Sequence, residues 1–219
     1  MQNSFFRLAT AATVAFGLTA AQGMAQDNGT TPVTNLSMGE EVNPDNAPGS
    51  IYLRDTTGDW EVRCQRAGEG QIDPCNLYQL LRDEGGQAVA EMTMFAMPEG
   101  QEAVAGAQII TPLETLLTQQ VRLSVDGGNV KRYPFAYCTT AGCISQIGLT
   151  QSDVDSFRRG ANGKLTIVPA RAPDGATVDL SISLSGFTAG FKMLQEITKE
   201  AIAAQAAAQE NAEGEAESE

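Results

Sequence analysis

Histidine is absent from all 219 residues of this chain. Its absence excludes a Ser-His-Asp triad, a Cys-His dyad and any histidine-ligated metal site. Basic residues are scarce as well, with 14 Lys and Arg against 27 Asp and Glu, so the formal net charge is −13. Because nucleic-acid affinity depends on Lys and Arg neutralising phosphates, we expect no nucleic-acid partner. The chain is not a disordered polyanion, however, since 42% of its residues are hydrophobic and only 19% are charged.

The chain has little in the way of extended apolar runs, and the run at its N-terminus is typical of an export signal. Arg7 precedes the apolar residues 8–21, and Gly23 and Ala25 place small side chains at the positions that a signal peptidase requires. The run is too short and too rich in Ala and Thr for a comfortable membrane span, which is the alternative interpretation. We therefore predict a signal peptide over residues 1–25, no transmembrane segment after its cleavage, and a periplasmic or secreted protein, with outer-membrane association as a further option.

Most of the negative charge lies at the two ends of the mature chain. Residues 26–50 carry a net −4, residues 196–219 a net −6 and residues 51–195 a net −4, and Arg7 of the predicted signal adds +1 to give the total of −13. Sequences of this composition do not bury enough apolar surface to fold alone. We predict a flexible acidic leader over residues 26–50, one folded domain with a docked helix over residues 51–197, and an Ala/Glu-rich disordered tail over residues 198–219.

Hydrophobic and polar residues alternate in the middle of the chain, which predicts strands with one buried face. Four runs show this alternation, and Gly-containing turns separate them. The runs are residues 60–64, 88–96, 121–125 and 178–184. This pattern favours an all-β fold, an immunoglobulin-like antiparallel β-sandwich, over a parallel sheet. A capping box at Thr150 and Asp153 predicts a short internal helix, and an apolar stripe that begins at Phe187 predicts a C-terminal helix.

Four cysteines in an exported chain are most simply a set of disulfides. Of the three possible pairings we predict the local one. Cys64 ends one strand and Cys75 begins the next, whereas residues 139–142 can form a tight turn that places Cys138 opposite Cys143. A redox pair and a tetrathiolate zinc site are the alternatives, but there is no Cys-x-x-Cys motif and the spacing is not that of paired zinc knuckles.

The order and spacing of several segments resemble those of one known family. These segments are Asp59–Cys64, Cys75, Ile110–Leu113, Val121–Gly128, Tyr133-Pro134-Phe135 with Cys138, Gly142 and Cys143, and Leu184–Phe187. Over residues 58–194 the chain resembles the invasion-associated locus B family of alphaproteobacteria, with Glu114 and Gln120 at positions where that family usually has Gly. The resemblance implies an exported cell-envelope protein with an immunoglobulin-like β-sandwich. It also implies a relation to proteins linked to host-cell entry, and it carries over no catalytic residue.

Two sets of residues allow a chemical interpretation beside a structural one. Met92, Met94 and Met97 could hold Cu(I), but the spacing of Met92 and Met94 also places them in the core, which we favour. Two pairs of acids could serve as a glycosidase pair by proximity alone, although turn, surface and capping roles explain them better. These pairs are Asp55 with Asp59 and Asp153 with Asp155.

The basic pairs Lys131-Arg132 and Arg158-Arg159 are either solvated surface or a patch for an acidic partner such as lipopolysaccharide or a glycan. We predict a non-catalytic binding module, not an enzyme, with no cofactor and no metal. Its partner would be a protein or glycan of the cell envelope or of a host surface. A periplasmic metal or small-ligand binder, or an accessory protein of envelope assembly or stress, is the alternative. The candidate binding loop consists of Thr139, Thr140, Ala141 and Gly142.

Overall fold

The computed structural model describes residues 47–216 of the chain. The predicted signal peptide, nearly all of the predicted leader and the last three residues therefore lie outside the described residues. The elements are β1 Ile51–Thr57, β2 Trp60–Gln65, β3 Cys75–Arg82, β4 Ala88–Ala96, β5 Ala105–Thr111, η2 Leu117–Gln119, β6 Val121–Val125, β7 Lys131–Tyr133, β8 Phe135–Thr139, β9 Gly142–Leu149, α1 Gln151–Arg159, β10 Asn162–Ile167, η3 Pro173–Gly175, β11 Val178–Ser183 and α2 Phe187–Ala216.

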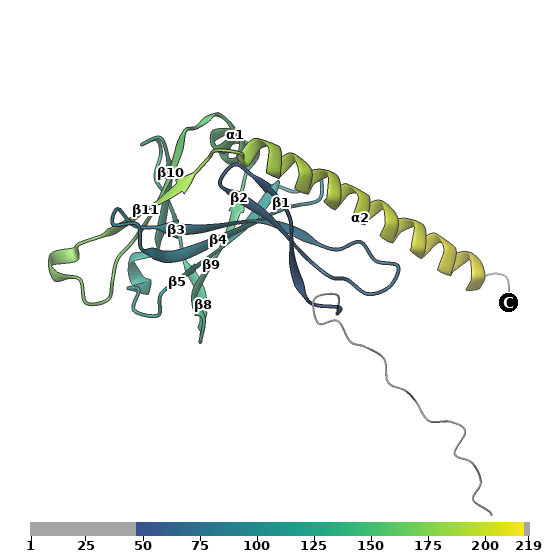
Figure 1. The fold of residues 1–219 in the computed structure, drawn as a ribbon, viewed down its shortest axis with the longest axis horizontal. Helices are drawn as coiled ribbons and strands as arrows, with labels where there is room; N and C mark the ends of the chain where they lie inside the picture. Colours follow the sequence, from purple (N-terminus) through teal and green to yellow (C-terminus); the bar gives the residue numbers. More distant parts are fainter. Residues whose placement is uncertain (1–46, 217–219) are drawn as a thin grey trace, which may run out of the picture. The chain divides into compact units, whose positions relative to one another are not determined.

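The strands form one continuous antiparallel sheet (Figure 1). Its main path follows the order β7-β6-β10-β11-β3-β4-β5-β9-β8, and β1 and β2 branch from β3. The two ends of this path nearly meet, because only Pro134 separates β7 from β8 in the chain. The Ser145 hydroxyl of β9 donates to the Pro134 carbonyl at 2.8 Å and holds this corner. The predicted all-β antiparallel class with two helices is thus confirmed, in a nearly closed sheet.

The core lies between the inner face of this curled sheet and the two helices. Phe187 is its centre, with ring centroids 5.7 Å from Trp60 of β2, 5.2 Å from Phe157 of α1 and 5.5 Å from Phe191 of α2. The side chains of Met92 and Met94 are fully buried in the same core. Their position agrees with the role of flexible core fillers and not with that of exposed copper ligands.

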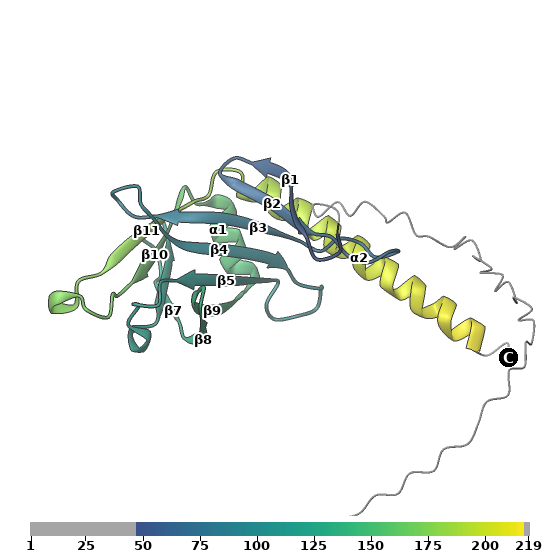
Figure 2. The ribbon, with the colours of Figure 1, turned by 60° about the horizontal axis from the view of Figure 1, so that its bottom comes forward.

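Helix α2 is longer than the sequence pattern predicted. Phe191, Leu194 and Ile197 are buried against the sheet, as the apolar stripe predicted. The helix nevertheless continues to Ala216, and its last turns run past the strands in Figures 1 and 2. The expectation of a disordered tail from residue 198 is therefore wrong for residues 198–216. The physical reason is intrinsic propensity, because Ala, Gln and Glu dominate this segment and are strong helix formers.

Two segments that carry the family resemblance contact each other although they are distant in sequence. The backbone N–H of Asp59 donates to the carbonyl of Ser185 at 3.1 Å, and the indole N–H of Trp60 donates to the carbonyl of Ser183 at 2.8 Å. The buried amide of Gln79 donates to the carbonyls of Asp59 and Ser183 and accepts from the N–H of Ser183. The resemblance therefore follows contacts that hold the fold together.

Gln120 departs from the family pattern at a strained position, which leads to a first prediction. Its backbone has φ 59° and ψ 166°, a region that essentially only Gly occupies without cost. We expect Gln120→Gly to raise the free energy of unfolding by about 1 kcal/mol, measured as a higher urea midpoint at unchanged m-value. Glu114→Gly is the control, because Glu114 is not among the residues with positive φ and should gain nothing. An equal gain at both positions would contradict the strain explanation.

Candidate functional site

The predicted binding loop is the tip of the β8–β9 hairpin. Cys138 and Cys143 lie opposite each other across the two strands and form a disulfide, as predicted. Thr139 pairs with Gly142, and the Ala141 N–H donates to the Thr139 hydroxyl at 3.1 Å. Gly142 has φ 147°, and a Cβ there would lie 2.3 Å from the Thr111 carbonyl oxygen. The disulfide and this glycine therefore hold an exposed tip in one conformation.

The second disulfide closes the loop between β2 and β3. Cys64 and Cys75 pair directly across these strands, again as predicted, and all four cysteines of the chain are thereby accounted for. Within this loop Asp73 accepts hydrogen bonds from the Ala67 N–H and the Tyr52 hydroxyl, both at 2.8 Å. These two bonds, the Ala67 one above all, lower the pKa of Asp73. The carboxylate therefore acts as a fixed anchor of the loop.

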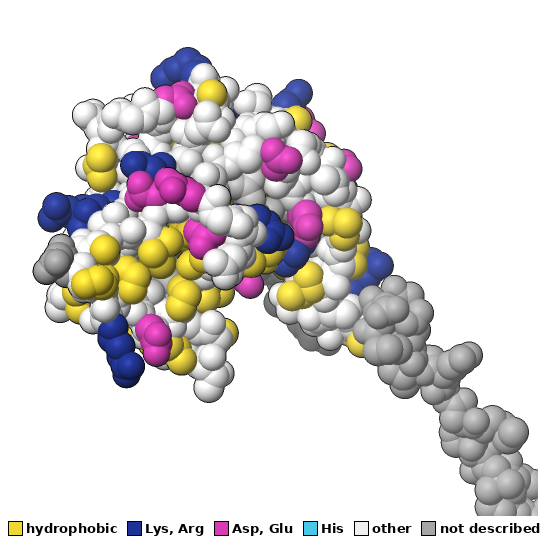
Figure 3. Space-filling view, turned by 60° about the vertical axis from the view of Figure 1, so that its left-hand side comes forward, with side chains coloured by type: hydrophobic (Ala, Val, Ile, Leu, Met, Phe, Trp, Pro, Cys, Tyr) yellow, Lys and Arg dark blue, Asp and Glu magenta, His cyan; other side chains and the backbone are white. Residues whose placement is uncertain are grey.

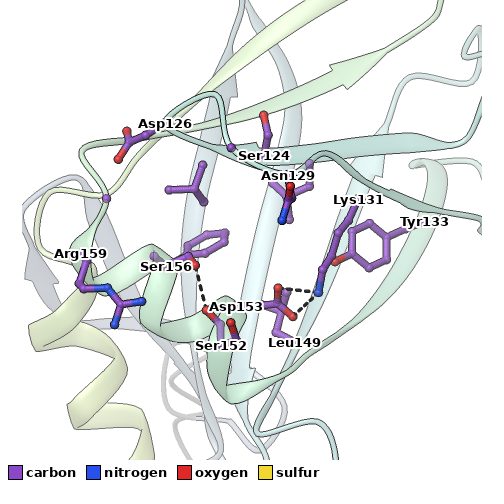
Figure 4. A pocket seen from close by; sticks show the side chains of 15 residues that line it. Ser124, Asp126, Asn129, Lys131, Tyr133, Leu149, Ser152, Asp153, Ser156 and Arg159 are labelled. Carbon is purple, nitrogen blue, oxygen red and sulfur yellow. Dashed lines mark hydrogen bonds and ion pairs between the residues drawn. The ribbon is translucent and has the colours of Figure 1, made fainter.

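A polar cleft of about 380 Å³, here called the α1 cleft, lies between α1 and the β6–β7 turn (Figure 4). Lys131, Tyr133 and Asp153 gather at one end, and Arg159 lies at the other. The sequence pattern predicted both of its walls: the Gly-rich turn after β6 and the capping box that begins α1. It did not predict the cleft, because these walls meet only through the pairing of β6, β7, β9 and β10.

The charges of the α1 cleft are held in fixed contacts. Lys131 Nζ lies 2.6 Å from one carboxylate oxygen of Asp153 and 2.8 Å from the other, and Asp153 also accepts from the N–H and hydroxyl of Thr150. Burial would raise the pKa of Asp153, but the bonds from Lys131 and Thr150 outweigh it and lower that pKa. Burial, with the charge of Asp153, raises the pKa of Tyr133 to about 12.

The other wall of the cleft is equally constrained. The carboxylate of Asp126 accepts from the backbone N–H groups of Ala161 and Asn162 at 3.0 and 2.9 Å, and these bonds lower its pKa. The predicted capping role of Asp153 is confirmed, because the capping box with Thr150 is complete. Asp155 is paired as well, with Arg158 at 3.5 Å. These contacts favour the structural interpretation of the two acids over a glycosidase pair.

The Asp153 contacts predict a pH-dependent loss of stability. Asp153→Asn should lower the free energy of unfolding at pH 7 by about 1 kcal/mol, since it weakens one partly exposed ion pair and one capping box. The folded-state pKa of Asp153 is lowered from 3.8. The carboxylate therefore contributes fully to the free energy of unfolding above pH 3.8, and this contribution is lost as the pH falls through the folded-state pKa. The variant and the parent should therefore converge in urea unfolding at a pH below the folded-state pKa of Asp153. A difference that persists unchanged at that pH would contradict this account.

A patch of one sign of charge and a cluster of metal ligands are two further features that mark functional sites. On the face seen in Figure 3, acidic and basic side chains are interspersed instead of forming a patch of one sign. Within residues 47–216, no three His, Cys, Asp or Glu side chains come close enough together to hold a metal ion. Over the same range, no helix has both the length and the apolar character needed to cross a membrane.

Comparison with known proteins identifies the family. The family model described as invasion associated locus B (IalB) protein matches residues 60–195. The chain belongs to the IalB family. It is 30% identical to Invasion protein B of Bartonella bacilliformis over 154 residues. This aligned region covers 69% of this chain and 79% of that protein. The crystal structure of invasion associated protein b from Bartonella henselae matches with a TM-score of 0.58 and 28% identity, over 68% of this chain and 99% of that one.

The range that matches the IalB family contains the features described above. Residues 60–195 run from β2 into the first turns of α2 and include both disulfides, the β8–β9 hairpin and the α1 cleft. The resemblance found in the sequence motifs is thus confirmed. The two disulfides and the likeness to an invasion protein fit an exported protein, since disulfides persist in oxidising compartments.

Proposed function

We propose that this IalB-family chain is a non-catalytic interaction module of the cell envelope. After cleavage of the signal peptide at residues 1–25 it would act in the periplasm or outside the cell. Its partner would be a protein or glycan of the envelope or of a host surface. The relatives named as invasion proteins support a role in contact with another cell. The β8–β9 hairpin is the proposed contact.

The observation that carries this proposal concerns the titratable side chains. Acid–base catalysis near pH 7 is most efficient with groups whose pKa lies close to neutrality. In the described part of the chain, every resolved shift leads away from neutrality: the pKa is raised for Tyr52, Tyr78 and Tyr133 and lowered for Asp73, Asp126, Asp153 and Asp179. Asp73, Asp126 and Asp153 accept backbone N–H groups and so hold a loop, a turn and a helix end. Such an arrangement supports binding by a rigid surface.

The geometry of the hairpin supports it as the contact. Its tip is exposed, and the Cys138–Cys143 bond fixes it directly behind the turn. A preorganised loop loses little conformational entropy on binding, which favours affinity. Rigid scaffolds commonly present their binding residues on such loops.

A capture experiment tests this proposal. The mature chain, residues 26–219, serves as bait for envelope extracts and for host-membrane extracts. We expect Thr140→Glu with Ala141→Lys to lose the captured component, because this double variant changes the exposed tip and leaves Gly142 and the disulfide intact. Thr177→Glu with Ala176→Lys makes the same changes in the exposed β10–β11 loop and should retain it. Equal capture by both variants would show that the hairpin is not the contact.

A second candidate function, binding of a small ligand, is favoured by the α1 cleft. Its volume of about 380 Å³ lies in the range of small-molecule sites. Arg159 supplies a positive charge at one end, whereas Lys131 at the other end is paired with Asp153. A thermal-shift screen of small organic acids tests it. Stabilisation that Arg159→Gln abolishes would support this function, whereas no stabilisation by any acid would exclude that ligand class.

A further inference from the structure

An uncharged hollow of about 360 Å³, here called the Phe95 hollow, lies on the outer face of β4, β5 and β9. Phe95, Gly106 and Gly148 form one row across these strands, because Phe95 pairs with Gly106 and Gly106 pairs with Gly148. The ring of Phe95 lies directly over Gly106, since a Cβ at that glycine would be 2.2 Å from the ring. Phe95 is nevertheless 41% exposed and offers one face to solvent.

Gly148 leaves the floor of the hollow open without a structural need. Its φ is not positive, and a Cβ there would meet only Ala103 at 3.4 Å, an ordinary contact. Glycine inside a strand weakens the strand, because it adds no packing and increases the entropy of the unfolded chain. A strand glycine that neither φ nor crowding explains is typical of a place where a ligand approaches the backbone closely.

Two amides form the next row of the hollow. Gln108 of β5 and Gln146 of β9 pair directly across the two strands, and both side chains line the hollow. Neither side-chain amide takes part in the hydrogen bonds found among residues 47–216. Each amide therefore offers two N–H donors and one acceptor oxygen beside the exposed ring of Phe95.

The strands that form the hollow, and the loop after β4, favour a neutral ligand over an anionic one. Strands β5 and β9 contain no charged residue. The charged residues of β4 and of the loop that follows it are all acidic: Glu91, Glu99 and Glu102. An anion would be repelled here, whereas a neutral ligand with many hydroxyl groups matches both the absence of charge and the unpartnered amides.

We infer that the Phe95 hollow binds a neutral hexose ring of a glycan, and this inference rests on the proposed interaction function and specifies its ligand. The exposed face of Phe95 is electron-rich and stacks against the C–H face of the sugar. Gln108 and Gln146 exchange hydrogen bonds with its hydroxyl groups. Gly148 allows the ring to lie against the strand. This combination of an aromatic face with a few placed polar groups is typical of small-ligand sites.

Titration of the ¹⁵N-labelled mature chain with maltotetraose, cellotetraose and chitotetraose tests this inference. We expect at least one sugar to shift the backbone amides of Gly106 and Gly148 and the side-chain amides of Gln108 and Gln146. Gly148→Val should weaken this binding about tenfold or more, because it fills the hollow with a side chain that suits a strand. Gly68→Val is the matched control, since Gly68 lies in an exposed loop with open space around it.

Three outcomes would overturn the inference: no shift with any of the three sugars, shifts that Gly148→Val leaves unchanged, or tighter binding of the anionic polygalacturonate at the same amides. The outcome is separable from that of the capture experiment. If the sugars fail while the hairpin still captures a component, the hollow is not a glycan site and the interaction function stands. If the sugars bind at the hollow while the hairpin captures nothing, the glycan inference stands without the hairpin contact.

Discussion

Gly186→Ala is expected to prevent stable folding, with a loss of more than about 3 kcal/mol in the free energy of unfolding. Gly186 has φ 82°, and a Cβ there would lie 1.9 Å from the carbonyl oxygen of Thr57. An added Cβ at Gly58, on the facing turn, would clash in the same way, because it would lie 2.4 Å from the carbonyl oxygen of Ser185. Two backbone turns thus contact each other directly, and neither can move aside as a flexible side chain would.

Far-UV circular dichroism with urea unfolding measures this loss, and Gly100→Ala provides the control. Gly100 has φ 87°, nearly the same backbone conformation, but no atom lies within 4 Å of its Cβ position. The control therefore carries the conformational strain without the clash and should lose only about 1 kcal/mol. Equal losses in the two variants would mean that strain alone, and not the contact between the two turns, makes Gly186 necessary.

Phe187→Ala should cost about 3–5 kcal/mol, because this ring joins the sheet to both helices. Phe187 is fully buried and packs against Trp60, Phe157 and Phe191. Its removal leaves a cavity that rigid neighbours on three elements cannot fill by collapse. We expect a lower urea midpoint and a red shift in the fluorescence of Trp60, which is the one tryptophan of the chain.

Tyr137→Ala is the control for this truncation. Tyr137 is 50% exposed on β8, so its removal should change the free energy of unfolding by no more than about 1 kcal/mol and leave the fluorescence unchanged. A loss at Phe187 as small as that at Tyr137 would contradict the central role of the aromatic cluster. It would imply that α2 is held to the sheet mainly by other contacts.

Local patterns predicted much of this fold correctly. The capping box at Thr150 and Asp153, the short helix that it begins and the two local disulfides all agree with the structure. Each depends on residues a few positions apart, or on the ends of adjacent strands. Backbone geometry and short-range hydrogen bonds decide such features whatever the rest of the chain does.

The same local reasoning failed where two physical effects compete. For residues 198–216, acidic low-complexity composition indicated a disordered tail, whereas the helix propensity of Ala, Gln and Glu produces a continuous helix. The α1 cleft and the Phe95 hollow were missed for another reason. Their walls come from segments that are far apart in sequence and meet through strand pairing.

The sequence by itself determined the family, the antiparallel strands, the disulfide pairing and the absence of histidine chemistry, because these depend on residue identity and short spacing. Only the tertiary structure decided which turns pack backbone to backbone at Gly58 and Gly186, how far α2 runs, and where the amides of Gln108 and Gln146 lie together. The physical reason is that side chains on different strands become neighbours only through the register and closure of the sheet. Alternation of apolar and polar residues predicts which face of a strand is buried, but it does not predict which strand pairs with it.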